Sequence, residues 1–234
     1  MDTKLSTQIC YDEYLKTKNE DRNKLLGNPE VVFQSFAYDS SIIKALSIIE
    51  IVPTVTKVLD VGCGSGGSLL NFLKYEFQPE NLFGIDILEE RVAEGVSKYP
   101  NLALTLGDAS KMGYESDFFN IVLESTMFLQ LTDEDLARKI GAEMIRVTKP
   151  GGHLILADWR YGKPRDKRFS PMNRRRIAKL FQVGTATEVV GEYKGALVPP
   201  LGRFLSSKIP SLYFLVRSLA PFLVGQVTTV LRKK

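Results

Sequence analysis

The chain has 234 residues, of which 44% are hydrophobic and 25% are charged, and its formal net charge is +4. These ordinary values exclude a disordered or fibrous chain and allow one domain with a sizeable core. Two cysteines, Cys10 and Cys63, are too few to staple a fold of this size. With a polar N-terminus that has no apolar targeting core, they favour a reducing, cytoplasmic compartment.

The first 50 residues are predicted to form helices. A polar and aromatic stretch begins at Tyr11, the pair Asn28-Pro29 breaks the pattern, and residues 40–50 carry an apolar stripe with serines suited to an N-cap. From residue 57 onward, short apolar strands alternate with helices, which is typical of a mostly parallel, doubly wound sheet. The predicted strands are 57–61, 82–87, 102–106, 119–123 and 153–158, and the predicted helices are 68–75, 89–98 and 132–147, the last capped by Thr132.

The last third of the chain is first basic and then apolar. Residues 160–179 contain nine Lys or Arg and one acid, a net charge of +8 that leaves −4 for the rest of the chain. Two interpretations of this basic run stay open: a solvated surface, or a platform for an anionic substrate. A helix is predicted at 172–181 and a strand at 185–194.

The segment 209–231 is strongly apolar, but Pro210, Arg217, Pro221 and Gln226 interrupt it. Because a membrane-spanning helix needs about 20 clean apolar residues, we predict a packed helix followed by a buried strand instead. Shallow contact with a bilayer surface is the weaker alternative. Two late strands around a helical insert indicate an antiparallel hairpin at the edge of the sheet.

The chemistry-bearing residues follow the ends of the predicted strands, where an open parallel sheet binds its ligands. The glycine-rich segment 62–67 follows the first strand and lets the backbone approach a ligand closely. Asp86 follows the second strand, 24 residues beyond Gly62, and its carboxylate can accept from both hydroxyls of a ribose. Gly107, Asp108 and Ala109 follow the third strand and can meet an adenine amino group.

The glycines at 62, 64 and 67 formally satisfy G-x-G-x-x-G, so a nicotinamide dehydrogenase is the competing interpretation. Three features disfavour it. Asp60 stands inside the strand before the glycines, where it suits an ammonium group rather than a pyrophosphate. About 55 residues of helix precede that strand, and the reductase-like pair Tyr14 and Lys18 lies before the glycines rather than after them.

The ordered motifs identify a family resemblance. Val-Leu-Asp-Val-Gly-Cys-Gly-Ser-Gly, Gly-Ile-Asp, Gly-Asp-Ala, Phe-Asn-Ile-Val and Lys-Pro-Gly-Gly, within 57–158, together resemble the class I S-adenosylmethionine-dependent methyltransferases. The resemblance implies a Rossmann-like α/β fold: a doubly wound, seven-stranded, mostly parallel sheet with an antiparallel last strand. N-terminal helices and a small helical insert before the last strand complete it. We expect one domain over 1–234, with a helical lid at 1–50, a cofactor-binding core at 57–160 and a substrate-side insert at 195–224.

The resemblance also implies S-adenosylmethionine as cofactor and S-adenosylhomocysteine as product. The residues around Gly62 would surround its methionine part, Asp86 would hold the ribose, the residues near Asp108 would meet the adenine, and Glu124 would border the sulfonium. No metal-ligand set is predicted. The expected cofactor-binding residues are Asp60, Gly62, Cys63, Gly64, Asp86, Ile87, Asp108, Ala109 and Glu124.

Candidates for the acceptor side are fewer. The single histidine, His153, begins the fifth predicted strand at the end opposite the cofactor, so packing is favoured for it. Glu124 and Asp158 lie at the carboxyl ends of neighbouring predicted strands, and either could act as base or substrate anchor. The candidate substrate-contacting residues are Tyr11, Tyr14, Trp159, Arg160 and Tyr161.

Three functions stay open at this point. The first is methyl transfer to oxygen or nitrogen of a small molecule, such as a nucleotide-linked sugar, a polyketide-like compound or a lipid-linked intermediate. The second is an RNA-modifying methyltransferase, which the basic run would serve, although no arginine-aromatic alternation accompanies it. The third is a cofactor-binding protein without turnover. We expect a monomer or a homodimer.

Overall fold

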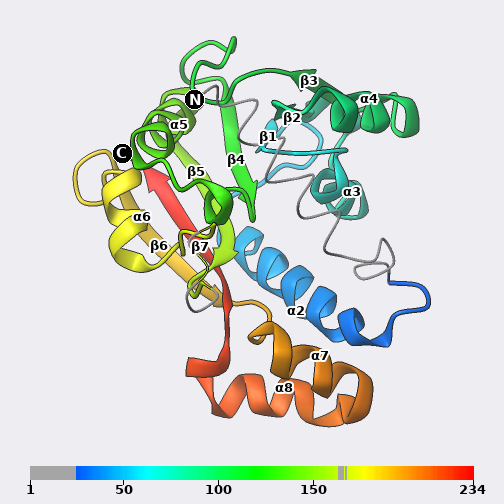
Figure 1. Cartoon of the computed structure of the whole chain (residues 1–234). Coiled ribbons are helices and arrows are strands. Elements are labelled where there is room, and N and C mark those ends of the chain that lie inside the picture. The colour runs from blue at the N-terminus through cyan, green and yellow to red at the C-terminus, as the bar shows by residue number, and fades with distance from the viewer. Residues whose placement is uncertain (1–24, 163–165, 167) are drawn as a thin grey trace.

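The computed structural model describes residues 25–162, 166 and 168–234; Cys10, Tyr11 and Tyr14 lie outside the described residues. Its centre is one seven-stranded sheet with the order β3-β2-β1-β4-β5-β7-β6 (Figure 1). The strands are β1 Val58–Val61, β2 Leu82–Asp86, β3 Ala103–Leu106, β4 Phe119–Ser125, β5 Thr148–Trp159, β6 Thr187–Lys194 and β7 Gln226–Lys233.

The strand directions match the predicted fold class. The pairs formed among β1 to β5 are parallel, whereas β7 is antiparallel to both β5 and β6. The late hairpin is therefore confirmed, with β7 inside the sheet and β6 at its edge.

The helices cover the faces and one end of the sheet. In Figure 1, α2 and the α7–α8 pair lie beyond the end of the sheet toward which β4 points. The predicted helical insert between the last two strands is thus present at the ligand-binding end of a doubly wound sheet. The helices are α2 Pro29–Leu46, α3 Gly67–Lys74, α4 Glu89–Lys98, α5 Glu134–Val147, α6 Arg174–Leu180, α7 Pro199–Lys208 and α8 Pro210–Leu219, with short 3-10 turns η2 Pro79–Asn81, η3 Phe128–Gln130 and η4 Pro221–Leu223.

Alternating strand residues build two cores, one on each face of the sheet. Val122 belongs to the core that packs against α5 and α6, and its neighbour Leu123 belongs to the core that packs against α2 and α3. A third, smaller cluster, which includes Ala37, Leu205 and Tyr213, joins α2 to the α7–α8 insert.

Two predicted helix starts are wrong. The helix predicted at 40–50 begins earlier, at Pro29, and the Asn28 side chain accepts a hydrogen bond from the Glu30 amide. The serines predicted to cap therefore lie inside α2. The cap of α5 is Asp133 rather than Thr132, because the Asp133 carboxylate accepts from the amides of the first helical turn.

The apolar segment 209–231 is only partly as predicted. Its strand is buried, but α8 buries a single side chain, Tyr213, and leaves most of its apolar residues exposed. Phe36 of α2 is also exposed. Within the part of the chain that the structure describes, no helix is both long and apolar enough to cross a membrane.

Candidate functional site

The glycine-rich turn leads from β1 into α3. Gly62 and Gly64 adopt φ values of +74° and +53°, which side-chain-bearing residues rarely adopt. A Cβ at Gly62 would lie 2.8 Å from Met127 Sδ, and one at Gly64 would lie 2.8 Å from Arg91 Nη2. Conformation therefore favours glycine at both positions, and an added Cβ would also displace the ends of the Met127 and Arg91 side chains.

Asp60 is the most unusual side chain of this region. It is 1% exposed, and neither carboxylate oxygen completes a hydrogen bond with a donor among the described residues. Burial, and then the nearby charge of Asp86, raise the pKa of Asp60 to about 8. The Ser68 hydroxyl offsets part of this pKa shift without making a hydrogen bond of normal geometry. A buried, unpartnered carboxyl group of this kind is costly unless a ligand completes it.

The aspartates at the next two strand ends differ from Asp60. Asp86 is partly exposed, and its carboxylate accepts from the amides of Gly64, at 2.7 Å, and Leu88, at 2.9 Å. Asp108 is exposed and accepts from the Ser110 amide at 2.8 Å. Because each carboxylate oxygen can accept more than one hydrogen bond, both groups keep acceptor capacity for a ligand.

The remaining cofactor candidates are apolar or small. Ile87 and Ala109 are half-buried beside these aspartates and could pack on a flat ring. Cys63 is buried, and burial followed by the charges of Asp60 and Asp86 raises the pKa of its thiol above the ordinary range. A thiol held protonated is a poor nucleophile, so Cys63 fills the turn.

Helix α2 closes the region from the side. The Tyr38 hydroxyl donates to the Ser125 hydroxyl at 3.1 Å, so α2 contacts the carboxyl end of β4. Burial is the main cause that raises the pKa of Tyr38, and the charge of Asp60 adds to it. The phenol is therefore a neutral hydrogen-bonding group close to Asp60.

Glu124 and Asp158 form a buried carboxyl pair. Glu124 is opposite Leu156 in the β4–β5 register, so Asp158, two residues further along β5, points to the same face. Both side chains are buried, and both accept hydrogen bonds from the turn at η3: Glu124 from the Met127 amide at 3.2 Å and Asp158 from the Leu129 amide at 2.8 Å.

Their protonation follows from this burial. Burial and the neighbouring Asp158 raise the pKa of Glu124 well above its ordinary value, and burial raises that of Asp158 to about 7. One Glu124 oxygen, Oε1, has no partner among the described residues. The pair therefore holds a proton near neutral pH, and it also fixes the turn that carries Met127 over Gly62.

Three predicted substrate residues lie against the insert. The Trp159 ring packs on Gly225, where an added Cβ would lie 2.9 Å from the ring. Arg160 Nε donates to the Val224 carbonyl at 2.7 Å, and the Tyr161 hydroxyl donates to the Phe222 carbonyl at 3.2 Å. These contacts fasten the insert to β5 rather than directing the three side chains toward the glycine turn.

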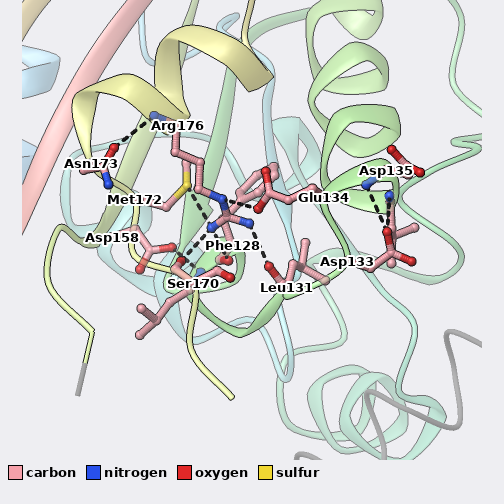
Figure 2. A network of polar contacts seen from close by, with 12 residues as sticks. Phe128, Leu131, Asp133, Glu134, Asp135, Asp158, Ser170, Met172, Asn173 and Arg176 are labelled. Carbon is pink, nitrogen blue, oxygen red and sulfur yellow. Dashed lines mark hydrogen bonds and ion pairs between the residues drawn. The ribbon is translucent and has the colours of Figure 1, made fainter. Parts of the chain in front are cut away.

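One arginine of the basic run, Arg176, is partly buried and links two segments of the fold, which neither interpretation of the run predicted. Figure 2 shows the Arg176 guanidinium, which reaches from α6 to the turn at η3 and pairs with Glu134 of α5 at 2.8 Å. It also donates to the carbonyls of Phe128 at 2.9 Å, Leu131 at 2.7 Å and Ser170 at 2.6 Å. Arg176 thus holds the turn that Glu124 and Asp158 hold from the other side.

His153 is far from this chemistry, as predicted. It is paired with Ile121 at the amino-terminal half of β4, and burial followed by Arg232 lowers its pKa, so the ring is neutral at pH 7. Within the described residues, no group of three His, Cys, Asp or Glu could hold a metal ion.

Sequence reasoning missed Met127, Arg91 and Arg176. Met127 and Arg91 line the glycine turn, and Arg176 holds the segment behind it. None of them belongs to a local motif, and only tertiary folding brings them to their partners.

Comparisons with known proteins agree with this geometry. Residues 58–152 match the family model described as a methyltransferase domain. The chain is 33% identical over 129 residues to 2-methyl-6-phytyl-1,4-hydroquinone methyltransferase of Synechocystis, covering 53% of this chain and 38% of that protein. It is 26% identical over 163 residues to demethylmenaquinone methyltransferase of Streptomyces avermitilis, covering 70% of this chain and 60% of that protein.

The fold has close structural counterparts. The PH0226 protein of Pyrococcus horikoshii superposes with a TM-score of 0.65 at 16% identity, over 95% of this chain and 99% of that one. The chain spans only about half the length of the curated relatives it matches. The substrates in the names of these relatives are therefore not assigned to this chain. The matched domain, the sheet order and the glycine turn agree with one another: residues 58–152 match a methyltransferase domain, and the fold around them resembles that of the class I S-adenosylmethionine-dependent methyltransferases.

Proposed function

We propose that this protein binds S-adenosylmethionine on the glycine turn and transfers its methyl group to a small-molecule acceptor. The observation that carries the proposal is Asp60, a buried carboxyl group whose two oxygens have no partner among the described residues. The amino acid end of S-adenosylmethionine supplies an ammonium group, which is the kind of partner that such a carboxylate needs.

The other residues of the turn fit the rest of the cofactor. Asp86 would accept from the ribose hydroxyls, Ile87 and Ala109 would pack on the adenine, and Asp108 would meet its edge. Glu124 and Ser125, at the end of β4, would border the sulfonium. Bound there, the cofactor supplies an already activated methyl group, so the protein mainly aligns the acceptor and excludes water.

We propose further that the Glu124–Asp158 pair takes up the acceptor's proton when the acceptor atom is a hydroxyl oxygen. A pKa of about 7 for Asp158 suits a group that exchanges a proton near neutral pH. Its expected signature is a pH profile: Asp158→Asn should remove the limb near pH 7 from the rate of transfer. A profile identical to that of the unmodified protein would leave the pair with a positioning role alone.

The surroundings favour an acceptor with a large apolar part. Helix α2 and the insert 195–224 lie at the same end of the sheet as the turn, and we propose that they act as lid and substrate wall (Figure 1). Two of the curated relatives carry the names of a phytyl hydroquinone methyltransferase and a demethylmenaquinone methyltransferase, and the first of these names includes an apolar phytyl chain. Of the open classes, a lipid-linked metabolite is therefore preferred for oxygen or nitrogen methylation.

The test separates binding from turnover. Calorimetry should detect binding of S-adenosylhomocysteine and no binding of NADH. Asp86→Ala should abolish the binding of S-adenosylhomocysteine, because the ribose loses its hydrogen-bond acceptor. Transfer of labelled methyl from S-adenosylmethionine should then be measured with hydroxylated aromatic acceptors that carry short prenyl chains, and with RNA. NADH binding without S-adenosylhomocysteine binding would overturn the assignment. Cofactor binding without transfer to any acceptor would favour the non-catalytic alternative.

A further inference from the structure

The insert exposes an apolar stripe that the proposed function does not use. Leu212, Leu215 and Leu219 recur at helical spacing along one side of α8, and Phe222 follows in η4. Leu219 is 76% exposed and Phe222 is 68% exposed. Contiguous exposed apolar side chains on a monomer usually mark an interaction surface. We call these four residues the α8 stripe.

The helix that carries the stripe is firmly anchored. Tyr213, on the opposite side of α8, is fully buried; its hydroxyl donates to Gln34 of α2 at 2.8 Å and accepts from the Leu197 amide at 3.1 Å. Arg217 Nε donates to the Gly195 carbonyl at 2.8 Å. The exposure of the stripe is therefore built into the fold and does not arise from a frayed segment.

The insert that carries the stripe is basic. Residues 193–225 contain four Lys or Arg and no Asp or Glu. Lys208 is exposed directly before α8, and Lys194 Nζ donates to the Ser218 carbonyl near its end at 3.2 Å. Apolar side chains with flanking cations are the chemistry of a helix that lies in the interface of an anionic membrane.

We propose that the α8 stripe docks the protein peripherally on an anionic lipid bilayer. The leucines and Phe222 enter the boundary between headgroups and acyl chains, while Lys208 and Lys194 contact anionic headgroups. Because the surface carries cations, we expect the docking to require negatively charged lipid. Like-charge repulsion would disfavour the alternative, a dimer formed through two copies of this basic surface. The docking does not depend on the methyl acceptor proposed above.

Helix α2 connects this surface to the glycine turn. Its Phe33 ring packs against Phe214 of α8 with centroids 5.8 Å apart, and its Tyr38 binds Ser125 at the end of β4. A protein docked through the α8 stripe would therefore present the ligand-binding end of its sheet to the membrane side. An acceptor with a lipid-like chain could then be reached without leaving the bilayer surface.

The experiment is vesicle co-sedimentation of the full chain. The vesicles are phosphatidylcholine alone, or phosphatidylcholine with roughly one third phosphatidylglycerol. We expect binding to the anionic vesicles only, and loss by high salt. Leu215→Ser with Leu219→Ser should weaken binding at least about tenfold, because both side chains lose their apolar transfer energy. Val55→Ser with Val96→Ser, which alters two exposed apolar residues elsewhere, should leave it unchanged.

Charge is tested in the same way. Lys208→Glu should weaken binding about fivefold or more, whereas Lys139→Glu on α5 should not. Thermal unfolding checks that each variant folds. If the double leucine variant does not fold, Leu219→Ser alone replaces it in the vesicle assay. Failure of the unmodified protein to bind anionic vesicles would overturn the proposal. So would binding that survives loss of the leucines, or a dimer that the leucine variant abolishes while vesicle binding is absent.

Discussion

At the residue scale, Asp60 links the fold to the cofactor most directly. Its place in β1 is imposed by the strand pattern, since Leu59 and Val61 on either side fill the core on the other face. Burial of this carboxyl group without a partner destabilises the folded state, as is common for polar groups in binding sites. A ligand that brings a positive charge recovers that cost.

This arrangement predicts proton release when the cofactor product binds. Without ligand, Asp60 has a pKa of about 8 and is mostly protonated at pH 7. A bound ammonium favours the carboxylate, so its pKa falls and up to about one proton leaves per S-adenosylhomocysteine bound. Calorimetry at pH 7 in two buffers of different ionisation enthalpy measures this number.

Asp60→Asn provides the matched comparison. It should remove the proton release and weaken binding about tenfold or more, since an amide cannot pair with the ammonium charge. The sign of the pH dependence follows: affinity of the unmodified protein should rise from pH 6 toward pH 8. An equal release from both proteins would show that another group titrates and would refute this role for Asp60.

At the element scale, the turn at η3 is held from two sides. Glu124 and Asp158 accept from its amides. Arg176 donates to its carbonyls (Figure 2). Because Met127 of the same turn lies against Gly62, these contacts set one wall of the proposed cofactor site. The turn is thus positioned by these polar contacts together with the buried Phe128 side chain.

We expect Arg176→Ala to destabilise the protein by about 2–4 kcal/mol, because it strips partners from three carbonyls and from Glu134. Its neighbour Arg175 is exposed, so Arg175→Ala should stay within about 0.5 kcal/mol. Urea unfolding measures both free energies. Equal losses of unfolding free energy at the two positions would contradict the stabilising role of the Arg176 contacts.

The elements also separate what the sequence could predict from what it could not. The strands were predictable because the apolar runs end at glycine or an acidic residue, and the glycine turn was predictable because its residues are contiguous. The start of α2 was misjudged because a proline suits the first helical turn as well as a break. Arg176 could not be foreseen, since its partners Glu134 and Phe128 lie 42 and 48 residues away.

At the scale of the whole molecule, the chain divides into an acidic part and a shorter basic part. The core up to residue 159 carries −9 and supplies Asp60, Asp86 and Asp108, whereas the remainder carries +13 and supplies the insert. Helix α2 packs on both, through the sheet core and through the cluster around Tyr213. Helix α2 therefore links the end of β4, beside the glycine turn, to the insert.

Ligand binding should accordingly stabilise the molecule as one unit. At a concentration of about one hundred times its Kd, S-adenosylhomocysteine adds about 2.7 kcal/mol to the free energy of unfolding. For a domain of this size that corresponds to a Tm increase of roughly 5–10 °C in a single transition. NADH at the same concentration is the control and should leave Tm unchanged. Two transitions, of which only one moved with ligand, would mean that the insert folds independently of the site and would contradict this coupling.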